Sequence, residues 1–191
     1  MEIKKKCLII YPFFAYYRKH ILDALFRSNF GWEFELVGDP KTSFGIKGID
    51  PNLANITIEK GGYNWTFARN SMPISIMGKR LPVFWQPGAI KRVIKNDYDA
   101  VIMMGSIYYV AYLLAIPFLK FSKKPIIFWT HGFLGKDNIF FENLRHFLYK
   151  RGDAFLLYGN RAKEIMLKSG KYEEKKLYTI YNSLDLSLIH I

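Results

Sequence analysis

A histidine follows a predicted strand at the point where a ligand would be expected. Residues 125–133 read PIIFWTHGF, an apolar run that stops at Thr130 and continues with His131 and Gly132. A continuous apolar run is typical of a buried parallel strand, and open α/β sheets bind ligands beyond the carboxyl ends of their strands. We therefore expect the His131 imidazole to face a binding cleft and to hydrogen-bond a ligand there. A histidine satisfied by backbone groups is the alternative.

The composition is that of a folded protein of one domain, or of one domain plus a fragment. The chain has 191 residues, half of them hydrophobic, with 13 Tyr and 16 Phe. Disordered chains have few aromatic residues, which excludes that class. The single cysteine, Cys7, lies in an apolar run and forms no internal disulfide, so a reducing, cytoplasmic compartment fits best.

The positive charge raises the question of an anionic partner. Lys and Arg total 28 against 16 Asp and Glu, a net charge of +12, which suits nucleic acid, anionic substrates or an anionic membrane surface. No sequence signature of a nucleic-acid-binding module is present, so nucleic acid is not expected as a partner. The helix predicted near 139–150 has an apolar stripe and a basic face that points away from it. The stripe consists of Phe140, Leu144, Phe147 and Leu148, and the basic face of Arg145, His146, Lys150 and Arg151. The basic face has two interpretations: a solvated surface or a patch that docks on a membrane.

The charge-free run at 100–119 is long enough for a membrane span, which needs about 20 apolar residues. Gly105 and Ser106 interrupt it where a strand would end and a helix would begin, with Ser106 as the cap, and Pro117 lies near its far end. We therefore predict a strand, a turn and a buried helix rather than a span.

Apolar strands alternate with helices along most of the chain, which predicts an α/β fold with a mostly parallel sheet. Between residues 40 and 87 glycine and proline interrupt the pattern, leaving 56–58 and 83–85 as short strand candidates. The remaining predictions are strands near 7–11, 33–37, 100–104, 126–130, 154–157 and 177–181, and helices near 17–26, 89–95, 107–119, 139–150 and 161–168.

Five sequence blocks, taken in order, resemble the amino-terminal half of GT-B glycosyltransferases of the large retaining family 4. The blocks are YPFFAYYRKHILDAL, YDAVIMMGS, PIIFWTHGF, RGDAFLLYGNRAKEIMLKSG and KLYTIYNSLD. The resemblance implies a Rossmann-like, three-layer domain, one half of a GT-B fold, that receives the acceptor. It also implies a nucleotide-sugar donor as co-substrate, no other cofactor and no obligatory metal.

The resemblance carries site residues with it. The family's His-Gly pair falls on His131, as the catalytic residue, and on Gly132, which would let backbone approach the ligand or would simply form a turn. Tyr17 and Arg18 resemble a Tyr-Arg pair of relatives that build surface polysaccharides; Arg18 would pair with an anionic group or be a plain surface residue. Phe14 would stack on a sugar or belong to the core, and Tyr158 follows a strand that opens toward the same crevice.

The sequence departs from the family in two places. Pro12 to Ala15 replace a glycine-rich loop that approaches the donor phosphates, which puts that contact in doubt. The family's second domain, with the residues that hold most of the donor, is not found in this sequence. We expect residues 1–181 to form the acceptor-side domain, 182–185 to begin an interdomain linker and 186–191, LSLIHI, to be a non-native tail that resembles a translated sequencing adapter.

The expected function is a fragment of a retaining glycosyltransferase, inactive alone, that acts in surface polysaccharide synthesis. The full enzyme would move a sugar from a nucleotide-sugar to a glycan or lipid-linked acceptor, at the inner face of the cell membrane. The alternative is a non-catalytic α/β module that binds an anionic ligand or a protein partner. An epimerase-like Rossmann enzyme is disfavoured because no G-x-G-x-x-G follows the first strand.

Overall fold

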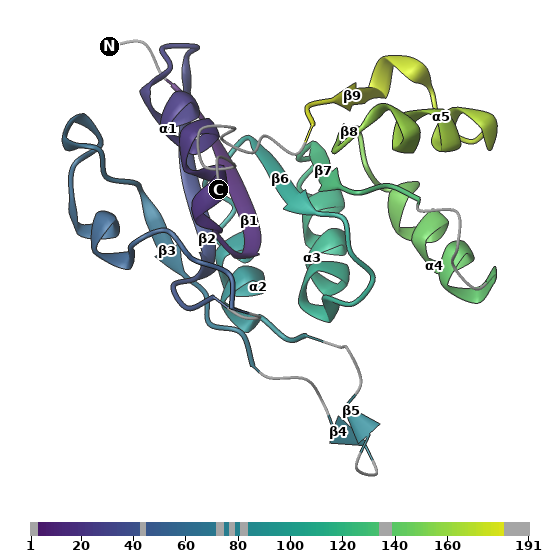
Figure 1. Cartoon of the computed structure of the whole chain (residues 1–191), viewed down its shortest axis with the longest axis horizontal. Coiled ribbons are helices and arrows are strands. Elements are labelled where there is room, and N and C mark those ends of the chain that lie inside the picture. The colour runs from purple at the N-terminus through teal and green to yellow at the C-terminus, as the bar shows by residue number, and fades with distance from the viewer. Residues whose placement is uncertain are drawn as a thin grey trace, which may run out of the picture.

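Strands and helices alternate along the chain in its computed structural model (Figure 1). The structure describes residues 4–42, 45–71, 75–76, 79–80, 84–133 and 139–181. The predicted linker at 182–185 and the predicted tail at 186–191 lie outside the described residues.

The elements follow the predicted order. The strands are β1 (Lys5–Phe13), β2 (Trp32–Asp39), β3 (Trp65–Phe67), β4 (Ser75–Ile76), β5 (Lys79–Arg80), β6 (Ala100–Met104), β7 (Ile126–Thr130), β8 (Ala154–Leu157) and β9 (Leu177–Thr179). The α-helices are α1 (Lys19–Arg27), α2 (Pro87–Ile94), α3 (Val110–Phe121), α4 (Ile139–Tyr149) and α5 (Asn160–Lys168). Short 3-10 helices are η1 (Tyr16–Arg18), η2 (Pro51–Asn55), η3 (Ile58–Lys60) and η4 (Glu174–Lys176).

Seven strands form one sheet in the order β3-β2-β1-β6-β7-β8-β9, and each pairing within it is parallel. The prediction of an α/β, Rossmann-like domain with a mostly parallel sheet is confirmed. Separately, β4 and β5 form an antiparallel pair. The strand order reverses between β1 and β6, so the chain builds outward from this pair in both directions. Such a reversal is where open α/β sheets open a crevice at their carboxyl ends.

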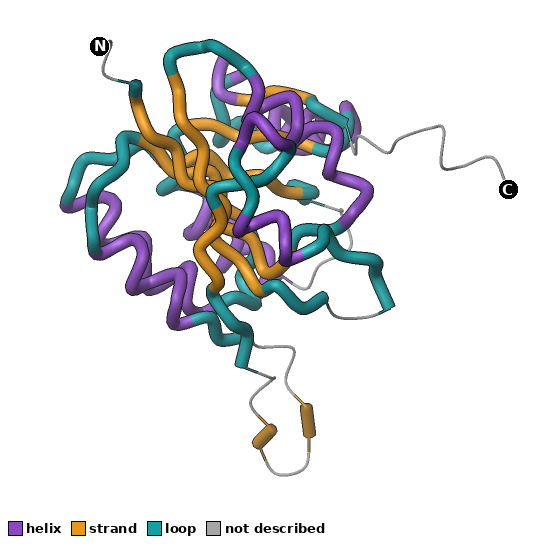
Figure 2. The backbone as a smooth tube through the Cα atoms, turned by 90° about the vertical axis from the view of Figure 1, so that its left-hand side faces the viewer, coloured by secondary structure: helices purple, strands orange, loops and turns teal. Residues whose placement is uncertain are grey.

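Helices cover both faces of the sheet (Figure 2). Alternate residues of β1 point to opposite faces, as a strand requires. Leu8 and Ile10 belong to one hydrophobic core with residues of α2, α3, α4 and α5, whereas Ile9 and Tyr11 belong to a second core with residues of α1. The three-layer arrangement expected from the sequence is therefore present, with more helices on one face than on the other.

The segment between β2 and α2 differs from its prediction. Of residues 56–58, expected as a strand, Ile56 and Thr57 lie between the 3-10 helices η2 and η3, and Ile58 begins η3. The edge strand is β3, which the sequence did not predict. β3 has three residues, too few to show an alternating pattern against the glycines around it. Of the other candidate, 83–85, only Phe84 and Trp85 are described, and each forms an isolated bridge.

The apolar run at 100–119 forms β6 and the buried helix α3, as predicted. Ser106 is not the helix cap, because α3 begins at Val110 after Tyr109, and the Ser106 hydroxyl instead accepts a hydrogen bond from the Tyr108 amide at 3.3 Å. Among the described residues no helix is both long and apolar enough to cross a bilayer.

Helix α4 is rotated from the orientation that its apolar pattern predicts. The sequence predicts a buried stripe that includes Phe140 and Phe147, with His146 on the wet face, but the structure exposes both phenylalanines and buries His146. His146 stacks on Phe133 at 4.4 Å between ring centroids, and its Nδ1 is 2.7 Å from the Tyr172 hydroxyl. Apolar residues lie all around this helix, so the pattern alone does not select its buried face.

A buried ion pair ties α2 to the sheet. Glu35 of β2 and Arg92 of α2 are 3% and 4% exposed. The guanidinium donates from Nε to Oε1 at 2.6 Å and from Nη2 to Oε2 at 2.7 Å, and Lys6 of β1 lies 2.8 Å from the same carboxylate. Burial acts to raise the pKa of Glu35, but hydrogen bonds from Arg92, Lys6 and Thr66 outweigh it and lower the pKa to about 2.

We predict that Glu35→Gln lowers the free energy of unfolding by about 3–5 kcal/mol at pH 7, because it removes the carboxylate that pairs with a buried guanidinium. The native pKa lies below the unfolded value, so the carboxylate contributes fully above the unfolded pKa and its contribution is lost as the pH falls toward 2. Urea unfolding should therefore show the two proteins converging below about pH 4.5. Glu173→Gln, which removes an exposed carboxylate beside Lys176, is the control and should leave the urea midpoint unchanged. A difference for Glu35→Gln that stays constant from pH 7 to pH 3 would contradict the assignment.

Candidate functional site

Two adjoining hollows open at the carboxyl ends of the central strands. Their volumes are about 200 Å³ and 220 Å³, and they share four lining residues, Tyr11, Met104, His131 and Tyr158. These residues come from β1 and β6, on either side of the reversal in strand order, and from the ends of β7 and β8. We call the two hollows together the switch-point pocket, and it lies where ligands of open α/β sheets bind.

A larger hollow, of about 470 Å³, lies at the opposite edge of the sheet. Residues before β1, after α1 and at the start of β2 line it, including Lys4, Arg27 and Trp32. By volume alone, this larger hollow would be the preferred candidate for a ligand site. Position and chemistry favour the switch-point pocket, because the carboxyl ends of parallel strands carry the ligand sites and because His131 lines that pocket.

His131 lies on the open rim of the sheet, where the sequence predicts it. The residue is exposed, lines both hollows, and its ring centroid is 4.2 Å from that of Tyr158. Thr130 fixes the turn beneath it: the hydroxyl lies 3.0 Å from the Gly105 carbonyl oxygen and accepts a hydrogen bond from the Gly132 amide at 3.2 Å. The imidazole is therefore held at the pocket by a side chain of the preceding strand end.

The environment favours a neutral imidazole at position 131. Partial burial lowers its pKa from the ordinary value near 6.5, and the positive charge of Arg18 lowers it further. At neutral pH one ring nitrogen therefore donates a hydrogen bond and the other accepts one. Such a group can bind a hydroxyl or take up a proton.

Gly132 makes the turn after β7 and lines one hollow of the switch-point pocket. Its φ is +69°, in the left-handed region that favours glycine, and a Cβ built on it would lie 3.0 Å from the Cβ of Ala162 in α5. The residue is buried and its missing side chain would point toward α5. The turn interpretation and close helix packing both account for glycine at this position.

We predict that Gly132→Ala lowers the free energy of unfolding by about 1–2 kcal/mol, the usual cost of a left-handed conformation for a residue with a Cβ. Gly159→Ala is the matched control, because Gly159 follows the neighbouring strand β8 in an extended conformation and a Cβ there meets nothing within 4 Å. Thermal or urea unfolding of the three proteins measures both effects. Equal stability of the two variants would show that Gly132 is not required for the turn.

Arg18 is buried, so the surface interpretation of this residue is wrong. It is 6% exposed, and its guanidinium carbon lies 4.1 Å from the ring centroid of Tyr11 and 4.6 Å from that of Trp129. Nη2 donates a hydrogen bond to the Tyr158 hydroxyl, which is also 2.5 Å from the Tyr11 hydroxyl. The side chain thus reaches from the start of α1 to the end of β8 and forms part of the pocket wall.

Tyr17 and Tyr158, both predicted site residues, line the pocket with Arg18 and His131. Both are half-buried. Burial, followed by the nearby Tyr11, raises the pKa of Tyr158, so its hydroxyl stays protonated. With Gly132, the structure brings together five of the six predicted site residues in the lining of the pocket.

Phe14 is a core residue rather than a platform for a sugar ring. It is 2% exposed and packs edge-on against Trp65, with ring centroids 5.6 Å apart. The loop that carries it is anchored by Gln86, whose amide nitrogen donates to the Pro12 carbonyl at 3.2 Å and to the Ala68 carbonyl at 2.9 Å. Buried polar anchoring of this kind holds the start of α1 in place.

Two pocket residues, Tyr11 and Trp129, are not among the predicted site residues. Strand periodicity contains the signal: Trp129 lies two residues before His131, and Tyr11 lies two residues after Ile9, so each pair shares one face of its strand.

Acidic and metal-binding side chains are sparse around the pocket. Within the described residues no group of three His, Cys, Asp or Glu side chains is placed to hold a metal ion. The polar side chains that line the pocket include the imidazole of His131, the guanidinium groups of Arg18 and Arg145, and hydroxyls of tyrosine, serine and threonine residues. The described residues therefore offer chemistry by hydrogen bonding and charge.

Comparison with known proteins shows the fold. No family model matches the sequence, and no curated protein matches it. The structure is similar to the UDP-GlcNAc 2-epimerase of Neisseria meningitidis bound to UDP-GlcNAc, with a TM-score of 0.57 and 12% identity over 96% of this chain and 48% of that one. It is also similar to the UDP-GlcNAc 2-epimerase of Methanocaldococcus jannaschii, with a TM-score of 0.52 and 18% identity over 92% and 45% of the two chains.

A third solved structure is a glycosyltransferase, GlyE of Streptococcus pneumoniae in its apo form, with a TM-score of 0.40 and 10% identity over 90% of this chain and 34% of that one. The chain has the fold of one half of GT-B proteins, and it spans about half the length of the epimerase structures that it matches.

Proposed function

We propose that this chain is the acceptor-side half of an enzyme that transfers a sugar, with retention, from a nucleotide-sugar to a glycan or lipid-linked acceptor. In this proposal residues 1–181 form the acceptor-side domain, the linker begins at 182–185 and a second domain holds most of the donor. Surface polysaccharide synthesis is the setting that the sequence resemblance implies. The half-GT-B fold is consistent with the proposal.

One observation carries the proposal: the imidazole of His131 stands on the open rim of an all-parallel sheet, beside the reversal in strand order. His131 lines both hollows, and Arg18 and Tyr158 lie next to it. A cleft at this position, with a few convergent polar groups in apolar walls, is the usual site of small-molecule binding.

The geometry suggests what His131 does during transfer. As the bond between the sugar and the nucleotide breaks, positive charge develops on the sugar ring and negative charge on the leaving phosphate. A neutral imidazole can hold a sugar hydroxyl by a hydrogen bond without adding positive charge beside the ring. Tyr17 and Tyr158 would form the walls against which the sugar lies.

Epimerisation of a nucleotide-sugar is a second candidate. The two UDP-GlcNAc 2-epimerase structures described above match this chain with TM-scores of 0.52 and 0.57. An epimerase is disfavoured by the sequence only because no G-x-G-x-x-G follows the first strand, and the fold shared with the two epimerase structures outweighs the absence of that motif. The non-catalytic binding module differs from both, because it predicts that no sugar chemistry accompanies ligand binding.

We predict that His131→Ala lowers turnover by about tenfold to a thousandfold, because the loss of one well-placed hydrogen-bonding group has an effect of this size. The assay uses the protein expressed from the uninterrupted reading frame that contains this chain. His20→Ala, on the exposed side of α1, is the control and should keep full turnover. Turnover is measured as nucleotide release from a nucleotide-sugar with and without acceptor, together with the identity of the sugar product.

The products separate the candidates. A transferase releases nucleotide in step with glycosylated acceptor, whereas an epimerase returns a nucleotide-sugar whose sugar is inverted at carbon 2 and needs no acceptor. Unchanged turnover in His131→Ala would contradict the role of His131. Saturable binding of the nucleotide-sugar without any product would favour the binding module.

The outer surface of α4 supports contact with an anionic membrane as part of this proposal. Ile139, Phe140 and Phe147 are 75%, 67% and 56% exposed, and basic Lys150 and Arg151 lie at the end of the same helix. Exposed aromatic side chains insert at the interface of a bilayer, and each nearby basic residue adds about 1 kcal/mol on an anionic surface.

We predict that the chain binds vesicles containing phosphatidylserine and that salt weakens the binding. The double variant Phe140→Ala with Phe147→Ala should bind these vesicles about tenfold more weakly or worse, because burial of each phenylalanine contributes about 1.5–3 kcal/mol. Phe30→Ala is the control, because Phe30 is equally exposed but lies after α1. Vesicle co-sedimentation measures the affinities. Equal binding to neutral phosphatidylcholine vesicles, or no effect of the double variant, would contradict the membrane contact.

A further inference from the structure

Arg18 carries a buried positive charge for which the described residues supply no negative partner. The side chains that interact with its charge are those of Tyr11, Tyr17 and Tyr158, and no carboxylate is among them. Nη2 donates to the Tyr158 hydroxyl, but Nε and Nη1 are buried without a hydrogen-bond partner among the described residues. Three of the five N–H groups of the guanidinium therefore lack an acceptor.

The other buried arginine shows what this fold does with such a charge. Arg92 is 4% exposed, against 6% for Arg18, and its guanidinium pairs with Glu35 through two hydrogen bonds. An isolated buried charge is costly, because desolvation is offset only by a counter-charge and full hydrogen bonding. Arg18 is thus a buried charge whose usual compensation is missing from the described residues.

A second unsatisfied donor lies beside the first. The indole Nε1 of Trp129 is buried and has no hydrogen-bond partner among the described residues, and the Trp129 ring centroid is 4.6 Å from the guanidinium carbon of Arg18. Arg18 lines one hollow of the switch-point pocket and Trp129 lines the other. Unsatisfied donors from two elements therefore belong to neighbouring side chains in the walls of the two adjoining hollows.

We propose that the ligand of the switch-point pocket carries a phosphate group, which binds Arg18 through Nε or Nη1 and accepts a further hydrogen bond from Trp129 Nε1. The substrate is then a phosphorylated sugar or a nucleotide-sugar rather than a neutral saccharide. A phosphate supplies both the missing charge and several acceptor oxygens, and arginine is well suited to it. This inference rests on the proposed function and names the substrate class of that same site.

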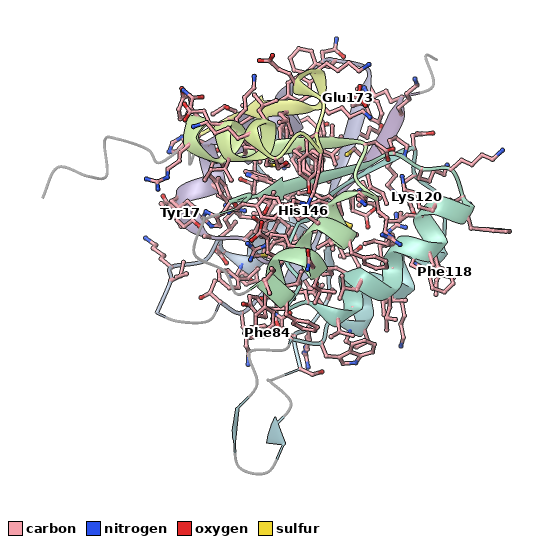
Figure 3. The ribbon with its side chains drawn as sticks, turned by 90° about the vertical axis from the view of Figure 1, so that its right-hand side faces the viewer. Tyr17, Phe84, Phe118, Lys120, His146 and Glu173 are labelled. Atoms are coloured by element: carbon pink, nitrogen blue, oxygen red, sulfur yellow. The ribbon has the colours of Figure 1, made fainter. Side chains whose placement is uncertain are left out.

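Entry of the phosphate requires one side chain to move. Tyr17 is half-buried at the edge of the molecule, lines the pocket, and its ring centroid lies 5.6 Å from the guanidinium carbon (Figure 3). Displacement of its ring uncovers the guanidinium from the side of the pocket. Of the other rings around Arg18, those of Tyr11 and Trp129 are buried on the sheet, and Tyr158 is held by its hydrogen bond to Arg18, so we expect these three to stay in place.

The competing explanation is that the aromatic rings alone stabilise the charge. Tyr11, Trp129 and Tyr158 surround the guanidinium, and cation–π contacts of a desolvated arginine are favourable. In that case Arg18 holds the three strand ends together, its replacement destabilises the protein, and phosphate has no specific effect.

The test compares the chain with Arg18→Met, which keeps an apolar side chain of similar length, and with Arg27→Met, which removes the same charge from the far end of α1. Inorganic phosphate is titrated at constant ionic strength by calorimetry, and thermal unfolding is followed with and without it. We expect phosphate to bind the chain and Arg27→Met alike and to raise their unfolding midpoints. Arg18→Met should lose at least about tenfold in phosphate affinity and should be as stable as the unmodified chain without phosphate.

Trp129→Phe gives an independent test that keeps the aromatic ring and removes only the donor. It should weaken phosphate binding several-fold and leave the unfolding midpoint without phosphate nearly unchanged. Should Arg18→Met fail to fold, this variant decides the matter. Phosphate binding that is equal in the chain, Arg18→Met and Trp129→Phe, or absent from all, would overturn the inference.

Two further ligands distinguish the source of the phosphate. If UDP binds more tightly than inorganic phosphate and this binding depends on Arg18, the pocket receives the diphosphate of the donor. If a sugar 1-phosphate binds more tightly than UDP, the pocket receives the acceptor. Arg18-dependent phosphate binding without any transferase or epimerase activity in the complete enzyme would sustain the inference while the proposed function fails. Activity with neutral acceptors and no Arg18-dependent phosphate binding would do the reverse.

Discussion

The parallel pairing of β1 with β6, across the reversal in strand order, is the constraint on which the site depends. The register places Ile10 beside Met103 and brings the strand ends of β1, β6, β7 and β8 to one edge. Because alternate residues of each strand share a face, Tyr11, Trp129 and Tyr158 meet on the same side of the sheet. A shift of one residue in any of these strands would send its aromatic side chain to the opposite face and leave Arg18 without its surroundings.

Each of the two buried arginines carries a positive charge that is costly to bury, and the fold compensates the two charges differently. Arg92 is paired within the fold, and its hydrogen bonds to Glu35 join α2 to the sheet. Arg18 is surrounded by rings and tyrosine hydroxyls, without a carboxylate among its described neighbours. A site that leaves a charge uncompensated in the free protein gains more from an anionic ligand, because ligand binding removes a cost that folding left in place.

Much of the fold could be predicted because its central strands are long apolar runs with clear breaks. β8 has the predicted bounds, and His131 lies at the strand end where its sequence context places it. The edge strand β3 could not be predicted, since three residues carry no period, and the rotation of α4 could not, since phenylalanines occur on more than one side of it. β3 does not line the switch-point pocket, whereas α4 contributes Arg145 and Tyr149 to one of its hollows.

The site was predictable in its position more than in the roles of its residues. His131, Arg18, Tyr17 and Tyr158 line one pocket because each follows a strand whose carboxyl end faces the same edge. Burial depends on contacts between distant segments, and no local pattern shows that Arg18 would be enclosed by Tyr11 and Trp129 or that Phe14 would pack on Trp65. Glycine at position 132 is likewise favoured by a distant contact, because a Cβ there would crowd Ala162 of α5, thirty residues further along the chain.

A crystal structure of the chain grown with UDP tests the central claim most directly, namely that the switch-point pocket receives a phosphate on its buried arginine. The account predicts phosphate oxygens at hydrogen-bonding distance, about 2.7–3.2 Å, from Nε or Nη1 of Arg18, with the Tyr17 ring displaced. UDP bound instead in the hollow beside Lys4 and Trp32, with Arg18 still enclosed by its aromatic neighbours, would contradict it.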